Sequence, residues 1–255
     1  MKFWRSLLSQ GIKRTKEELS WLSCQLLPPH CQLCRAPLTT INSSTSTSLC
    51  YHCATQCKTS AADCCPRCNE PYATSSVTRH YCSQCLRHPP QFLWLKTAGI
   101  YTETMASAIH QFKYQGRASL AKPLAQCIIT QLAQDITAYQ PDLIIPVPLH
   151  SSRLKERGYN QSVLLARHLG KEFQIPVCTK TLFRNRPTSP QTLLNATQRR
   201  NNLRGVFEIR QTIPPKQILL IDDVVTTTST ARSCAHLLTT HGHTVAVIAL
   251  GRASL

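Results

Sequence analysis

The stretch ILLIDDVVTTTSTA, residues 218–231, decides the fold. Four apolar residues run directly into Asp222 and Asp223, and a hydroxyl-rich turn follows before a helical pattern begins. Carboxylates at the end of a strand can accept hydrogen bonds from ribose hydroxyls, while N–H and hydroxyl groups at the start of a helix can bind phosphate. The stretch therefore predicts a sugar-phosphate site. The alternative interpretation is an ordinary helix capped by Ser or Thr.

Strands and helices alternate on both sides of this stretch. Apolar runs predict strands over 142–147, 217–221 and 244–250. Periodic apolar residues predict helices over 102–115, 117–132, 160–170 and 229–241, with Asn160 as a cap and Gly170 as a stop. Residues 184–204, rich in Arg and Asn, predict a long loop. The alternation predicts an α/β fold with a mostly parallel sheet.

Cysteines dominate the N-terminal third, because eleven of the fourteen lie between Cys24 and Cys85. Two Cys-x-x-Cys pairs supply four thiolates, the ligand set of many structural zinc sites. Sequential pairing predicts two zinc ribbons, neither with enough apolar surface to fold without metal. Iron–sulfur clusters, or a ligand exchanged for Cys57, Cys64 or a nearby His, are the alternatives. The predicted ligands are Cys31, Cys34, Cys50 and Cys53, then Cys65, Cys68, Cys82 and Cys85.

The composition predicts three segments. Residues 1–28 carry Trp4, Leu8 and Ile12 one turn apart, which predicts an amphipathic helical extension. Residues 29–90 form the double zinc-ribbon module, and 91–255 form the α/β domain. No apolar run reaches the length of a membrane span, no signal-peptide pattern is evident, and metal-binding thiols indicate a reducing compartment. We therefore expect a cytoplasmic protein.

The chain is strongly basic. It has 29 Lys and Arg against 12 Asp and Glu, a formal charge of +17 at pH 7. This excess predicts an anionic partner, either a phosphorylated small molecule or a nucleic acid, and charge alone does not distinguish them. The sequence contains neither a GxGxxG motif nor a Walker phosphate loop, which disfavours dinucleotide binding and nucleoside triphosphate hydrolysis.

Several motifs carry a family resemblance. Residues 218–231 resemble the phosphoribosyl pyrophosphate (PRPP) motif of type I phosphoribosyltransferases. FKYQG at 112–116, IIPVPLH at 144–150 and RLKERGYNQS at 153–162 resemble the ComF family of competence proteins, which includes GntX-like proteins. So does a loop containing Arg186, Thr188, Gln191, Arg199, Asn202, Gly205 and Phe207. With the cysteine pairs, the resemblance covers residues 31 to about 250.

The resemblance implies a type I phosphoribosyltransferase-like sheet with helices on both faces. Asp222 and Asp223 would be the catalytic pair facing the ribose. The 5-phosphate would bind Thr226, Thr227, Thr228, Ser229 and Thr230. The pyrophosphate would lie near Pro146, Val147 and Pro148, with Mg²⁺ and basic residues stabilising its charge. The candidates for that basic role are Arg153, Arg157 and Arg186.

The resemblance also implies a function in uptake of single-stranded DNA on the cytoplasmic side. Trp94, Tyr101, Tyr114 and Tyr159 are the candidates for stacking on bases. Two alternatives stay open, a phosphoribosyltransferase with an unknown acceptor and a non-catalytic scaffold for a protein partner of the DNA-uptake machinery. The enzyme question turns on Thr228, because the family has glycine there. If the position requires a positive φ, threonine costs about 1–3 kcal/mol and crowds the phosphate.

Overall fold

The computed structural model describes residues 29–38, 49–56, 64–72, 79–100, 103–186 and 205–253. The chain divides into two compact units, Met1–Cys53 and Ala54–Leu255. The predicted helical extension at 1–28 lies outside the described residues, as does most of the predicted loop at 184–204. The three-segment division predicted from the sequence stays a prediction.

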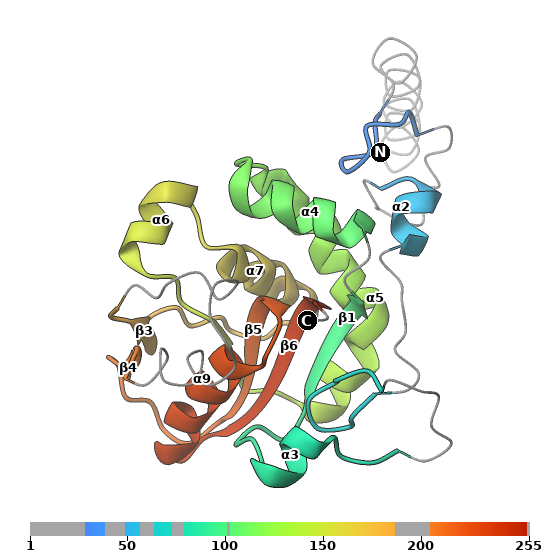
Figure 1. Cartoon of the computed structure of the whole chain (residues 1–255). Coiled ribbons are helices and arrows are strands. Elements are labelled where there is room, and N and C mark those ends of the chain that lie inside the picture. Colours follow the sequence, from blue (N-terminus) through green and yellow to red (C-terminus); the bar gives the residue numbers. More distant parts are fainter. Residues whose placement is uncertain are drawn as a thin grey trace, which may run out of the picture. The chain divides into compact units, whose positions relative to one another are not determined.

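A four-stranded parallel sheet forms the centre of the larger unit (Figure 1). The strand order is β1 (Leu95–Ile100), β6 (Thr244–Arg252), β5 (Gln217–Val225) and β2 (Leu143–Pro146). The central strands β5 and β6 are buried over almost their whole length, as expected for a parallel sheet covered on both faces. The carboxyl ends of the strands meet at one edge of the sheet, where Pro146 pairs with Ile221.

Helices cover both faces of this sheet (Figure 1). One face packs against α5 (Ala121–Tyr139) and α7 (Gln161–Phe173), and the other packs against α9 (Ser229–Thr240). The larger unit also contains α3 (Ser83–Arg87), α4 (Glu103–Tyr114), the 3-10 helix η1 (Ala118–Leu120), α6 (Ser151–Arg157) and an antiparallel pair, β3 (Leu182–Arg184) and β4 (Phe207–Ile209). The predicted fold class is confirmed.

The end of α7 corrects one prediction. The helix begins after Asn160 as predicted, since the Asn160 Oδ1 accepts from the backbone N–H groups of Ser162 and Val163. It does not stop at Gly170 but continues to Phe173. Glycine at position 170 provides space, because a Cβ there would lie 2.5 Å from a methyl carbon of Val177.

Other elements differ in extent or were not predicted. The helix predicted over 117–132 starts as η1 and then continues as α5 to Tyr139. The sequence analysis did not predict the short elements β1, α6, β3 and β4, because none of them has a clear periodic pattern of apolar residues.

The second ribbon, residues 64–72 and 79–88, shares the hydrophobic core of the sheet. Cys65, Cys68 and Cys85 are buried in one apolar cluster with residues of β1, β5, β6 and α9. The backbone N–H of Leu95 donates to the Arg67 carbonyl at 2.9 Å, which attaches the ribbon to the edge strand β1. The ribbon thus completes the cover of the face on which α9 lies.

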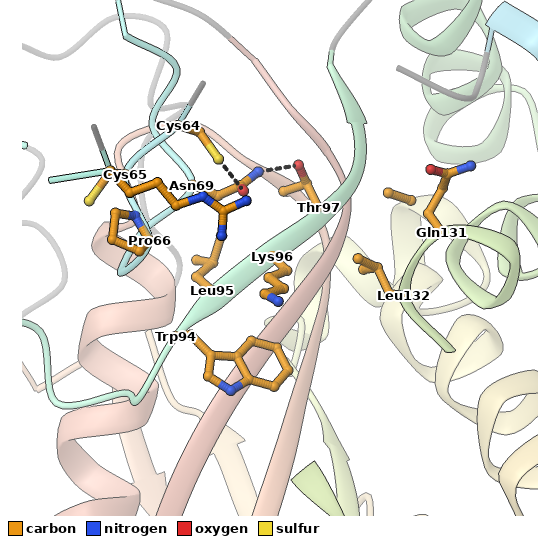
Figure 2. A pocket seen from close by; sticks show the side chains of 12 residues that line it. Cys64, Cys65, Pro66, Asn69, Trp94, Leu95, Lys96, Thr97, Gln131 and Leu132 are labelled. Carbon is orange, nitrogen blue, oxygen red and sulfur yellow. Dashed lines mark hydrogen bonds between the residues drawn. The ribbon is translucent and has the colours of Figure 1, made fainter. Parts of the chain in front are cut away.

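An asparagine joins this ribbon to β1 through its side chain (Figure 2). Asn69 Nδ2 donates to the Thr97 Oγ1 at 2.8 Å, and its Oδ1 accepts from the Cys64 thiol at 3.1 Å. A cavity of about 370 Å³ lies beside this contact, between the ribbon, β1 and α5. Cys64 therefore contributes to docking, and it does not belong to the cysteine cluster next to it.

Candidate functional site

Two acids stand near the carboxyl end of β5. Successive residues of a strand point to opposite faces of its sheet. Asp223 forms an ion pair with Lys113 of α4, with the Lys113 Nζ 2.9 Å from its Oδ1. Asp222, by contrast, interacts electrostatically with Arg184 and with the thiol of Cys234 on α9. Both acids are buried, with 9% and 8% of their surfaces exposed, and Lys113 acts on both, through its ion pair with Asp223 and through its charge on Asp222.

The protonation of Asp222 is shifted toward neutral pH. Burial raises the pKa of Asp222 to about 7, and the charge of Asp223 acts in the same direction. The positive charge of Lys113 opposes the increase without cancelling it. A carboxyl group with this pKa is partly protonated near pH 7, so it can donate or accept a hydrogen bond there.

Basic side chains gather beside Asp222. Burial lowers the pKa of Arg184, and the like charges of Arg153 and Arg157 lower it further. The negative charge of Asp222 opposes this shift. Guanidinium groups that repel one another favour an added anion, so this part of the site suits a phosphate or pyrophosphate.

The predicted phosphate loop connects β5 to α9. Thr228 has φ 60° and ψ 0°, the left-handed conformation for which glycine is preferred. Its hydroxyl does not cap the helix but accepts from the Arg232 Nε at 2.9 Å. The hydroxyls of Thr227 and Ser229 lie 2.9 Å apart. The expected backbone requirement for a positive φ is therefore present, and threonine adopts it at a cost of about 1–3 kcal/mol.

Hydrogen bonds bring the other family motifs to the same edge. Val147 N–H donates to the Ile221 carbonyl at 2.8 Å, and Asn160 Nδ2 donates to the Val147 carbonyl at 3.0 Å. Gln161 Nε2 donates to the Phe112 carbonyl at 3.2 Å. The motifs at 112–116, 144–150 and 153–162 are thus fixed next to the two acids and the loop.

The structure brings most of the predicted site residues together. Residues 146–148, 222–223 and 226–230 lie at the carboxyl edge of the sheet, and Arg153 and Arg157 approach it. Arg186 is exposed beyond β3. Sequence reasoning missed Lys113, Arg184, Arg232 and Cys234. Of these, only Lys113 had a signal, because it lies inside the FKYQG motif.

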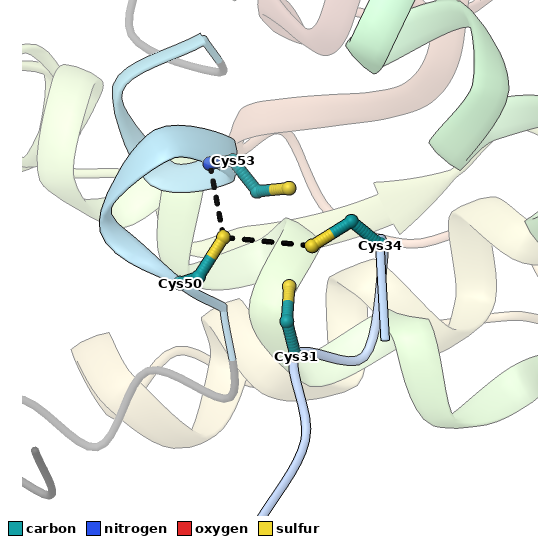
Figure 3. Close-up of side chains that lie close together, drawn as sticks. All are labelled: Cys31, Cys34, Cys50 and Cys53. Atoms are coloured by element: carbon teal, nitrogen blue, oxygen red, sulfur yellow. Dashed lines mark hydrogen bonds between the residues drawn. The ribbon is translucent and has the colours of Figure 1, made fainter. Parts of the chain in front are cut away.

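The first four predicted metal ligands form a compact cluster (Figure 3). The Sγ atoms of Cys31, Cys34, Cys50 and Cys53 all lie within 4.8 Å of one another, and those of Cys34 and Cys50 are 3.6 Å apart. Tetrahedral zinc with bonds of about 2.3 Å requires sulfur atoms about 3.8 Å apart. This cluster can hold one metal ion.

The second cluster repeats this arrangement with Cys65, Cys68, Cys82 and Cys85. Its sulfur atoms also lie within 4.8 Å of one another, and the Cys68 and Cys82 sulfurs are 3.6 Å apart. In each cluster one pair lies on a short helix, α2 (Tyr51–Gln56) or α3 (Ser83–Arg87), or just before it. Sequential pairing of the four motifs into two clusters is confirmed.

Backbone groups prepare one thiol in each cluster for metal binding. Burial raises the pKa of Cys31, but hydrogen bonds from the backbone of Cys34, Cys50 and Leu33 outweigh it and lower the pKa to about 7. At Cys65, burial also raises the pKa, and backbone hydrogen bonds lower it below its ordinary value. Metals bind the thiolate form, so these N–H groups favour coordination.

Several known proteins are similar to the chain along most of its length. It is 34% identical over 219 residues to DNA utilization protein YhgH of Escherichia coli O157:H7, covering 85% of this chain and 93% of the relative. It is 31% identical over 196 residues to competence protein F of Haemophilus influenzae, covering 74% and 83%. It is 25% identical over 205 residues to competence protein ComFC of Bacillus subtilis, covering 78% and 81%.

The other comparisons add less. No family model matches the chain. Among solved structures, orotate phosphoribosyltransferase from Aeropyrum pernix is 15% identical with a TM-score of 0.33, covering 53% of this chain and 61% of that chain. The part of the chain that the structure describes has no helix with the length and apolar character of a membrane span. The identity with YhgH and competence protein F over most of their lengths shows that this chain belongs to the ComF family.

Proposed function

We propose that this protein acts in DNA utilization, handling single-stranded DNA on the cytoplasmic side of the membrane during natural transformation. The observation that carries the proposal is its identity with proteins named for DNA utilization and for competence. The formal charge of +17 supports it, because Lys and Arg contacts to phosphates supply most of the affinity for a nucleic acid strand.

One exposed aromatic residue is suited to contact DNA bases. Tyr114 is 56% exposed, and the Arg157 guanidinium carbon lies 4.8 Å from its ring centre. Successive bases stack on aromatic rings beside cations in proteins that bind single strands. Trp94 instead packs edge-on against Tyr139, and the Tyr159 hydroxyl donates to the Phe112 carbonyl. Tyr101 lies outside the described residues, and Tyr114 is therefore our base-stacking residue.

The DNA proposal is tested by fluorescence anisotropy with a labelled oligo-dT strand. We expect the affinity to fall steeply as salt rises, and Tyr114→Leu to weaken binding about 5- to 150-fold, because stacking contributes about 1–3 kcal/mol per base. Tyr51→Leu is the matched control, since Tyr51 is 86% exposed in the smaller unit. A flat salt response, or equal losses in both variants, would contradict the proposal.

The same protein carries a site for a ribose 5-phosphate group, in our proposal. The support is the juxtaposition of Asp222, the Thr226–Thr230 loop and the cationic group of Arg153, Arg157 and Arg184. Mg²⁺ would accompany PRPP, with carboxylate oxygens as its protein ligands. Binding without turnover is the better-supported form. The Cβ of Thr228 crowds the loop that would hold the phosphate, and the Asp223 carboxylate is already engaged in an ion pair with Lys113.

Calorimetric titration with PRPP and Mg²⁺ tests this site and separates the rival functions. We expect the natural protein to bind, Asp222→Ala to lose most of the affinity, and Thr228→Gly to bind more tightly. Release of pyrophosphate by the natural protein, and not by Asp222→Ala, would show that the site cleaves the anomeric bond with water as the acceptor, which would support the transferase alternative. Absence of binding in both the natural protein and Thr228→Gly would leave the scaffold alternative, which predicts a protein partner instead.

Each cysteine cluster, we further propose, holds one structural Zn²⁺. Four thiols in tetrahedral reach are the set that zinc prefers, and structural zinc supplies folding free energy to small modules. Native mass spectrometry should find two zinc ions per chain, and iron in their place would contradict this assignment.

A further inference from the structure

Arg232 joins three parts of the larger unit through one guanidinium group. Its Nε donates to the Thr228 Oγ1 at 2.9 Å, and its Nη1 donates to the His88 carbonyl at 2.6 Å, directly after α3. Its Nη2 donates to the Cys85 Sγ at 3.7 Å. The predicted phosphate loop, the end of α3 and a member of the second cysteine cluster thus share one side chain.

The geometry of arginine makes this connection rigid. The guanidinium is planar and presents its donors in fixed directions, so the position of one hydrogen-bond partner constrains the others. Two of its three hydrogen-bond partners are held in place by the surrounding core, because Thr228 is 3% exposed and Cys85 is 4% exposed. A shift of Cys85 therefore moves the guanidinium and withdraws the donor from Thr228.

Thr228 supplies the acceptor that this connection needs. A glycine at position 228 would adopt the left-handed conformation without strain but would have no hydroxyl for the Arg232 Nε. The residue that departs from the family pattern is thus also the residue that attaches the loop to Arg232. A purely structural role would explain why Arg232 contacts the His88 carbonyl. Such a role does not require that the same side chain also contacts the Thr228 hydroxyl and the Cys85 thiol.

We propose that Arg232 is a positioning residue that couples metal binding at the second cysteine cluster to ligand binding at the phosphate loop. This inference rests on the proposed sugar-phosphate site. A metal ion bound by the four thiols fixes Cys85 and α3, and Arg232 transmits that position to Thr228. Because coupling between two sites is reciprocal, a sugar phosphate on the loop also alters the metal centre.

The first test measures metal affinity and needs no sugar phosphate. Hydrogen bonds to metal ligands typically contribute 10- to 100-fold in affinity. In full-length protein, Arg232→Gln should weaken zinc binding by the second cluster by that factor in chelator competition, while the first cluster is unchanged. The control is Arg167→Gln, the same change at an exposed position of α7. Equal zinc affinity in Arg232→Gln and the natural protein would overturn the proposal.

The second test detects the coupling itself. In full-length protein loaded with Co²⁺, ribose 5-phosphate should shift the thiolate-to-cobalt absorption band of the natural protein. Thr228→Gly removes the acceptor but leaves the Arg232 contact with Cys85, so it should bind ribose 5-phosphate without the shift. A purely structural Arg232 predicts equal shifts in both proteins, and that result would also overturn the proposal.

The two tests keep this inference separate from the proposed function. If calorimetry finds no binding of ribose 5-phosphate to the natural protein or to Thr228→Gly, the sugar-phosphate site is wrong and coupling to it is overturned as well. A loss of zinc affinity in Arg232→Gln would then show that the arginine supports the metal centre alone. If Arg232→Gln does not fold, Arg232→Lys provides the zinc measurement, because it keeps the charge and loses the planar fork.

Discussion

The two cysteine clusters share a local structure but differ in what surrounds them. Each cluster contains a tight turn, residues 31–36 in the first and 65–70 in the second. In each turn the backbone N–H of the first cysteine donates at 2.8 Å to the carbonyl five residues ahead, that of Ala36 or Glu70. The fifth position of both turns has a positive φ, 62° at Arg35 and 59° at Asn69. Yet the first cluster lies in the Met1–Cys53 unit, while the second is part of the core of the sheet domain.

Three equivalent positions account for the difference. Leu33, Arg35 and Ala36 of the first turn correspond to Arg67, Asn69 and Glu70 of the second. Each residue of the second turn reaches beyond its own ribbon. Arg67 donates to the Pro90 carbonyl, Asn69 to Thr97, and Glu70 pairs with Arg252 of β6. A repeated metal turn thus becomes part of a domain core through side chains that do not bind metal.

The largest expected effect comes from removing one cluster at a time. Cys65→Ser with Cys68→Ser should unfold the sheet domain, because a structural zinc contributes on the order of 10 kcal/mol and this cluster lies in the core. Cys31→Ser with Cys34→Ser should leave the thermal unfolding of that domain unchanged. Circular dichroism and zinc stoichiometry measure both. Equal destabilisation by the two double variants would break the comparison.

The two regions should also respond differently to pH. The described residues of the first ribbon, 29–38 and 49–56, contain no carboxylate side chain, whereas the sheet domain buries Asp222. A raised pKa means that the folded state holds this proton more tightly. Stability from protonated Asp222 is therefore complete below about pH 4 and is lost as pH rises through about 7.

Asp222→Asn measures this contribution, because asparagine mimics the protonated carboxyl. The difference in unfolding free energy between Asp222→Asn and the natural protein should grow by about 2 kcal/mol from pH 5.5 to pH 8 in favour of the variant. Measured from acid pH, where Asp222 is fully protonated, the growth approaches about 4 kcal/mol at pH 8. Urea unfolding at the two pH values checks this. The control is Glu172→Gln at an exposed position of α7, and an equal response in both variants would contradict the prediction.

A smaller effect is expected at the contact between β6 and the second ribbon. Arg252 is buried, pairs with Glu70 and donates to the Cys68 carbonyl at 2.8 Å. Arg252→Gln should cost about 2–3 kcal/mol of the domain's unfolding free energy, since hydrogen bonds to charged groups contribute about that much. Arg35→Gln in the first ribbon should change it by less than about 0.5 kcal/mol. Denaturant unfolding of both variants provides the measurement, and a neutral Arg252→Gln would refute the docking role.

The smallest effect should differ in sign between the repeats. Arg35→Gly relieves an arginine in the left-handed conformation and should stabilise the first metal site slightly, by about 1 kcal/mol. Asn69→Gly loses the bonds to Thr97 and Cys64 and should destabilise the sheet domain by about 1 kcal/mol. Chelator competition for zinc measures the effect of Arg35→Gly, and thermal unfolding of the sheet domain measures the effect of Asn69→Gly. Stabilisation by both changes would mean that backbone strain outweighs docking at Asn69, and destabilisation by both would mean that Arg35 is not strained.

Local signals predicted a large part of this structure. The apolar run before Asp222 predicted the first part of β5, which continues through both acids to Val225. The Asn160 cap predicted the start of α7, and the cysteine spacing predicted both clusters. These features depend on neighbouring residues or on repeats within a short stretch, which sequence patterns record directly. The expectation that Asp222 and Asp223 both face the ribose stays a prediction, and the alternation of side chains along a strand favours only one of them in that position.

Contacts between distant segments were not predictable in the same way. Arg232 reaches Cys85, and Arg252 reaches Glu70, across more than half of the chain. An arginine in a basic protein looks like a solvated surface residue until the fold places it against its partner. The same holds for Arg184, whose burial beside Asp222 has no local signature. The unpredicted part of the site is thus mainly its cations.

The strand order has a consequence for synthesis of the chain. The edge strand β1 pairs with β6, which is the last strand described, so β1 leaves the ribosome long before its sheet partner exists. An unpaired strand edge is prone to pair with other chains. The ribbon that immediately precedes β1 already bonds to it through the Arg67 carbonyl. A nascent chain that has captured its second metal ion can therefore shield β1 until the strand ending at Arg252 arrives.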